Sequence, residues 1–176
     1  KAGQKGTGKW SVIEAQNMGV AATAIEAAVA GRILSSQKVE REKAETILGL
    51  PKLADLPADK AAFIDDLENA LLAAKIGAYA QGFAVMSAAS TEFGWNLPMP
   101  TIARIWRAGG IIRSAFLDEI TSAFTKDPNV ANLVVPPAFA AMVKETDGAL
   151  RRVVAHAALS SLPVPALSSA LSYFDT

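Results

Sequence analysis

Alanine is the residue that most constrains what this chain can fold into, because it occupies 35 of the 176 positions. Alanine has the highest helix propensity, and its methyl side chain lets two helices approach closely. Runs of β-branched residues, which mark strands, are rare in the sequence. The sequence therefore predicts one all-α domain over residues 1–176, built from five to eight helices around a shared core.

Capping residues, glycines and prolines predict where the helices begin and end. The longest helix is expected at 60–92, because Asp59 is a good N-cap and apolar residues then recur at spacings of three and four. A helix is expected at 10–41, with a joint near Gly19, and another at 101–126, with an interruption at Gly109 and Gly110. A further helix is expected to start at Asp127 and Pro128, and the last two are expected at 138–161 and 167–174.

Charge and residue types exclude several function classes. The 17 Lys and Arg residues balance the 17 Asp and Glu residues, so no basic excess indicates nucleic-acid binding. Without cysteine, and with His156 as the single histidine, no cysteine nucleophile, cysteine zinc site or multi-histidine metal site is possible. No metal is expected. We also expect no membrane span and, without a signal peptide, a cytoplasmic location.

The opening segment, AGQKGTGKW at 2–10, partly matches the phosphate-binding P-loop. Gly3, Gly8 and Lys9 fit the pattern, but Trp10 stands where the P-loop needs Ser or Thr to hold magnesium. No later strand ends in a magnesium-binding aspartate. A nucleoside-triphosphate site is therefore disfavoured.

The same segment is nevertheless suited to an anion. Glycines let backbone N–H groups point at a ligand, Lys5 and Lys9 add positive charge, and Thr7 adds a hydroxyl donor. A helix expected to begin at about Trp10 adds the positive end of its dipole. A terminal tail without function is the alternative.

Arg32 is the second candidate. In a helix it shares a face with Ile25, Ala28 and Val29. A guanidinium on such a stripe must find an anion or lie at the edge of the stripe. An internal ion pair, for example with Glu26, is the commoner outcome, and a phosphate bound jointly with the opening segment is the alternative.

The remaining candidates favour structural roles. Arg104, Arg107 and Arg113 surround the Gly109–Gly110 interruption, and packing and internal ion pairs explain them better than ligand binding.

Two further pairs and one histidine complete the set. Asp65 and Asp66 suit a solvated helix start, and His156 lies in an apolar helical context without an evident partner. Lys75 and Tyr79, four apart on the long helix, are weak evidence of enolisation chemistry.

Five segments resemble 6-phosphogluconate dehydrogenase, in register along nearly the whole chain. They are the opening segment at 2–10, Ala28 to Ser36, FIDDLENALLAAKIGAYAQGF at 63–83, IWRAGGIIRSAFL at 105–117 and LPVPALSSALSYFD at 162–175. Residues 49–59 are not matched.

The resemblance implies an enzyme of the pentose phosphate pathway that uses NADP to oxidise and decarboxylate 6-phosphogluconate to ribulose 5-phosphate. Hydride leaves C3 while a lysine takes the hydroxyl proton, and an acid protonates the enediol that remains after loss of CO₂. The family is homodimeric, with a Rossmann domain, an all-α domain and a C-terminal tail that reaches into the other subunit.

The resemblance places this chain in the all-α domain, as a substrate-binding and dimerisation piece that lacks the catalytic lysine and glutamate and is inactive alone. Lys5, Thr7 and Arg32 look like the family residues that bind the substrate phosphate. Gly31 departs from the larger residue usual beside the arginine. No cofactor-binding residue carries over, and NADP versus NAD stays open. A helical binding module that kept the fold without the enzyme is the alternative function.

Overall fold

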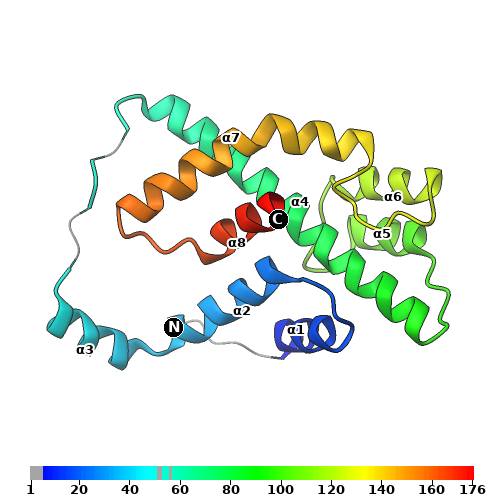
Figure 1. Cartoon of the computed structure of the whole chain (residues 1–176), viewed down its shortest axis with the longest axis horizontal. Helices are drawn as coiled ribbons and strands as arrows, with labels where there is room; N and C mark the ends of the chain where they lie inside the picture. The colour runs from blue at the N-terminus through cyan, green and yellow to red at the C-terminus, as the bar shows by residue number, and fades with distance from the viewer. Residues whose placement is uncertain (1–5, 51–52, 56) are drawn as a thin grey trace.

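The computed structural model describes residues 6–50, 53–55 and 57–176, and these ranges contain eight α-helices and no strand (Figure 1). The predicted all-α class is therefore confirmed. The helices are α1 (Thr7–Asn17), α2 (Thr23–Ser36), α3 (Lys38–Leu48), α4 (Lys60–Glu92), α5 (Met99–Ala108), α6 (Leu117–Lys126), α7 (Pro137–Leu159) and α8 (Pro165–Asp175).

Helix α4 is the central element, and its observed bounds equal the predicted ones. The Asp59 side chain accepts a hydrogen bond of 3.0 Å from the backbone N–H of Ala62, as expected of an N-cap. With 33 residues, α4 is about 50 Å long and crosses the molecule between the other helices (Figure 1).

The core consists of two clusters along α4. In the larger one, Phe83 of α4 meets Phe124 of α6 with ring centroids 5.3 Å apart, and Phe139 of α7 is buried in the same cluster. In the smaller one, alanines of α4 pack against Leu150 and Val153 of α7. Small residues on α4 thus let α7 lie close along it.

Glycines mark two further close approaches. A Cβ at Gly77 of α4 would lie 3.3 Å from the ring of Phe174 in α8, so a larger residue fits only if the ring shifts slightly. A Cβ at Gly31 of α2 would lie 3.4 Å from Pro165, at the start of α8. Helix α8 therefore packs against both α2 and α4.

The predicted helix at 10–41 is wrong in its extent. Helix α1 begins at Thr7, three residues earlier than expected, and Gly6 precedes it with φ of 94°. The joint near Gly19 is confirmed, and this glycine has φ of 64°. A second break after Ser36 separates α2 from α3.

Two other boundaries also differ from the predictions. The interruption at Gly109 and Gly110 is confirmed but continues to Phe116. No helix restarts at Asp127, because its side chain accepts a hydrogen bond of 2.9 Å from the backbone N–H of Asn129 and forms a turn there.

Helix α3 differs from the others because it has no buried residue. Figure 1 shows it apart from the helices that form the two core clusters. No helix in the described ranges has the length and apolar character that a membrane span requires.

Candidate functional site

Thr7 is the first residue of α1 and directly follows Gly6 in the sequence. The Gly6 carbonyl accepts a hydrogen bond of 3.1 Å from the backbone N–H of Trp10, which closes the first turn. Because α1 begins at Thr7, this residue lies at the positive end of the helix. Lys5 lies outside the described residues.

Helices α1 and α2 approach each other closely near the start of α1. A Cβ at Gly8 would lie only 2.9 Å from Cγ2 of Val29 in α2, so no larger residue fits there without a shift. Arg32 follows Val29 by three residues and therefore lies one turn further on the same side of α2. The structure thus brings the first turn of α1 to the part of α2 that carries Arg32.

Arg32 and Thr7 are both exposed. The guanidinium of Arg32 is therefore not buried among the apolar residues of its helix face. It lies at the edge of the stripe instead. Glu26, the suggested ion-pair partner, accepts a hydrogen bond of 2.7 Å from Nε2 of Gln16. That bond links α1 to α2.

Gln81 of α4 holds the beginning of α2, a role that the sequence analysis missed. Its side chain has no exposed surface, its Oε1 accepts a hydrogen bond of 3.0 Å from the backbone N–H of Ala24, and its Nε2 donates to Oγ1 of Thr23 at 3.3 Å. The available signal was a lone amide inside an apolar helical segment, which must find partners when buried.

The three arginines around the 109–116 loop divide into two kinds. Arg107 forms an ion pair of 2.7 Å with Asp118, so the expected internal ion pair is confirmed for this residue. Arg104 and Arg113 are exposed.

Asp66 is not part of a solvated helix start, and that prediction is wrong for it. Its carboxylate pairs with Arg152 of α7 at 2.6 Å, whereas Asp65 is exposed. The hydrogen bond from Arg152 lowers the pKa of Asp66 below its ordinary value of 3.8. Asp66 therefore links α4 to α7.

His156 is half-buried, with its ring 5.0 Å from that of Phe63 in an edge-on contact and Ser160 Oγ 3.4 Å from its Nε2. This environment confirms the predicted structural role. The Tyr79 hydroxyl donates a hydrogen bond to the carbonyl of Ile112, and burial raises the pKa of this phenol. Tyr79 thus anchors the 109–116 loop, and Lys75 beside it is exposed.

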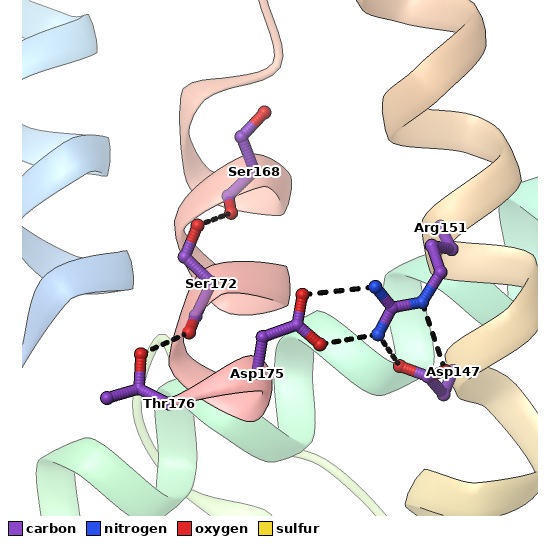
Figure 2. Close-up of polar contacts among 6 residues, drawn as sticks. All are labelled: Asp147, Arg151, Ser168, Ser172, Asp175 and Thr176. Atoms are coloured by element: carbon purple, nitrogen blue, oxygen red, sulfur yellow. Dashed lines mark hydrogen bonds and ion pairs between the residues drawn. The ribbon is translucent and has the colours of Figure 1, made fainter.

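Arg151 forms a second ion network that the sequence analysis did not identify (Figure 2). Its guanidinium lies between two carboxylates, 3.0 Å from Asp175 and 3.1 Å from Asp147. The hydrogen bond from Arg151 lowers the pKa of Asp175 below 3.8. The spacing of four between Asp147 and Arg151 signals the first pair, but nothing in the sequence indicates that Asp175 joins them.

The described residues contain no group of three or more His, Cys, Asp or Glu side chains that could hold a metal ion. The candidate site consists of Thr7 at the start of α1 and Arg32 of α2, both exposed. Its available chemistry is hydroxyl donation, a guanidinium charge and a helix N-terminus, all of which favour a phosphate.

Comparison with known proteins identifies the family. The family model described as 6-phosphogluconate dehydrogenase, C-terminal domain, matches residues 1–176. The decarboxylating 6-phosphogluconate dehydrogenase of Synechococcus elongatus is 46% identical over 175 residues, which cover 99% of this chain and 37% of the relative. The Schizosaccharomyces pombe enzyme of that name is 48% identical over 174 residues, or 99% of this chain and 35% of the relative.

A solved structure is similar over the same range. Plasmodium falciparum 6-phosphogluconate dehydrogenase, described in apo form, with its cofactor NADP⁺ and with its substrate 6-phosphogluconate, gives a TM-score of 0.93 at 39% identity. The match covers 99% of this chain and 38% of that one. The chain thus spans little more than a third of the length of these relatives, and it belongs to the 6-phosphogluconate dehydrogenase family, within the C-terminal domain.

Proposed function

We propose that residues 1–176 form the helical substrate-binding and dimerisation domain of an NADP-dependent 6-phosphogluconate dehydrogenase. The reaction is the oxidative decarboxylation of 6-phosphogluconate to ribulose 5-phosphate. Besides the family match, one observation of the structure supports this proposal. The contact of Gly8 with Val29 joins the turn that holds Thr7 to the helix that holds Arg32.

The proposed role of this surface is to bind the substrate phosphate through Lys5, Thr7 and Arg32. A guanidinium can bind two phosphate oxygens at once, and a threonine hydroxyl can donate to a third. The phosphate is distant from the carbon that reacts, so binding it contributes by orienting the other end of the substrate. Lys5 is included on the family resemblance alone.

Titration calorimetry with 6-phosphogluconate and with unphosphorylated gluconate tests this role on the chain itself. We expect binding of 6-phosphogluconate and none of gluconate, and we expect Arg32→Gln to weaken binding by about tenfold or more. Arg104→Gln removes an exposed arginine elsewhere and serves as the matched control. Equal effects of the two substitutions would overturn the phosphate assignment and favour a helical module without this ligand.

NADP is assigned to the rest of the proposed enzyme. The described residues contain no strand, and the sequence has no dinucleotide fingerprint that opens a helix after a strand, so they do not fit this cofactor. We therefore place no catalytic step on the chain. Mixed with NADP and 6-phosphogluconate, it should give no increase in absorbance at the NADPH wavelength, and measurable turnover would contradict this division of labour.

The proposed partner is a second copy of the same chain, and the proposed location is the cytoplasm. Exposed apolar side chains on α3 and the first half of α4 support the homodimer; they include Val39, Ile47, Leu48, Ile64 and Leu71. Exposed apolar surface is a feature of protein interfaces. Sedimentation velocity should show a dimer, and a monomer at high concentration would argue against self-association of this domain.

A further inference from the structure

A cavity of about 610 Å³ lies against the second half of α4. Its other walls come from α1, α2, α5 and the loop after α5, with Ile25 and Trp106 among them. A volume of this size lies within the usual range of small-molecule sites. Most of its lining is apolar, with aromatic side chains from Tyr79, Phe83 and Trp106.

Two glycines of α4 differ in their surroundings. An added Cβ at Gly77 would lie 3.3 Å from the Phe174 ring, a tight contact. At Gly82, which lines the cavity, an added Cβ would meet no atom within 4 Å. Glycine costs about 1 kcal/mol relative to alanine inside a helix. No packing contact explains Gly82, which lines the cavity.

The charges at the cavity are all of one sign. Lys75 and Arg113 line it and are exposed, so their charged ends reach solvent. No carboxylate occurs among the described residues that line it, and within the described part of the chain neither cation forms an ion pair. The Tyr79 hydroxyl already donates a hydrogen bond to the Ile112 carbonyl, so it is not available to a ligand in the cavity.

We propose that this cavity binds a small amphipathic anion, with an aromatic or aliphatic body in the apolar interior and a single anionic group beside Lys75 and Arg113. The interior supplies contact area for the body, and the two cations select the charge. The cavity includes Ser11 of α1 and Ile25 of α2, so it adjoins the two helices that carry the proposed phosphate surface. It takes a ligand of a different class, because a sugar phosphate has no apolar body.

Two matched fluorescent probes test the proposal on the 176-residue chain. One is 1-anilinonaphthalene-8-sulfonate, and the other is N-phenyl-1-naphthylamine, the same ring system without the sulfonate. We expect saturable binding of the sulfonate at one site per chain, with quenching of Trp106 fluorescence. Lys75→Gln with Arg113→Gln should weaken sulfonate binding about five- to tenfold and change binding of the neutral probe less than twofold.

Gly82→Phe tests the location, because Gly82 lines the cavity and an added Cβ there would meet no atom within 4 Å. It should weaken binding of both probes at least tenfold, whereas the control Gly82→Ala should change binding less than twofold. Near-UV circular dichroism checks that each variant keeps its tertiary structure. The proposal is overturned if no saturable binding occurs, if folded Gly82→Phe binds as Gly82→Ala does, or if the double charge variant affects both probes equally.

Discussion

Helices α3 and α4 follow each other in the chain, yet they are stabilised in opposite ways. Helix α4 buries seven residues against α7, α8 and its other neighbours, whereas α3 buries none. Within α3, Lys38 and Glu42 form an ion pair of 3.1 Å at the spacing of one helical turn. An isolated helix of 11 residues is marginal in water, so α3 depends on local propensity and on any partner surface that covers it.

The largest effect should come from truncating the core that α4 organises. Phe83 is 2% exposed and packs against Phe124 and Trp106. Phe83→Ala should lower the free energy of unfolding by about 3–5 kcal/mol, through lost burial and the cavity left behind. Urea unfolding followed by circular dichroism measures it, and a loss below about 1 kcal/mol would show that α4 is not the centre of the core.

A leucine side chain should have different effects on stability at two glycines of α4. Gly77→Leu forces a side chain against Phe174 and should cost about 1–3 kcal/mol. Gly82→Leu places the same side chain in open space and should be neutral or stabilising by up to about 1 kcal/mol. The difference between the two unfolding midpoints is the readout, and equal midpoints would contradict the close approach of α4 and α8.

Removing the Tyr79 hydroxyl should have a smaller effect. Tyr79→Phe keeps the ring and loses the hydrogen bond to the Ile112 carbonyl, which should cost about 1 kcal/mol. Amide hydrogen exchange in the 109–116 loop should accelerate, while exchange in α7 stays unchanged. Unaltered loop exchange would mean that this bond does not hold the loop.

Acid should weaken the packed region through its ion pairs. Asp66 and Asp175 have lowered pKa values in the folded chain, so the unfolded chain binds more protons as the pH falls through their ordinary value of 3.8. Their stabilisation is present above that pH and is lost as the pH drops through the folded values. The double substitution Asp66→Asn with Asp175→Asn should flatten the decline in unfolding free energy between about pH 5 and about pH 3. If the slope of unfolding free energy against pH stays unchanged, groups other than Asp66 and Asp175 cause the acid sensitivity.

The smallest effect is expected in α3. Ile47 is 71% exposed, so Ile47→Ala should change the unfolding free energy of the monomer by less than about 0.5 kcal/mol. Measured at low concentration, a loss above about 1 kcal/mol would show that α3 is packed after all. A loss that appears only at high concentration would place Ile47 in the proposed dimer contact.

The same comparison explains which elements the sequence predicts. Helix α4 is fully predictable because a cap, an apolar period and the absence of proline agree. The helix expected from Asp127 and Pro128 is wrong, because an aspartate that can cap a helix can equally close a turn on Asn129. Local chemistry at Asp127 permits both outcomes, and tertiary packing decides between them.

The candidate site was only partly predictable for the same reason. Thr7 and Arg32 are identifiable as anion-binding residue types, and the family resemblance relates them to one phosphate. The contact of Gly8 with Val29 and the bonds of Gln81 to the start of α2 are long-range features that spacing does not encode. The tie between Asp175 and Arg151 is of the same kind.

Steady-state kinetics of the complete dehydrogenase test the proposed phosphate site most directly. Arg32→Ala should lower kcat/KM for 6-phosphogluconate by about 10- to 100-fold, as for loss of a charge-assisted hydrogen bond. Arg104→Ala, the exposed control, should leave kcat/KM within about twofold. A KM and kcat/KM that Arg32→Ala leaves unchanged would contradict the assignment of the substrate phosphate to this surface.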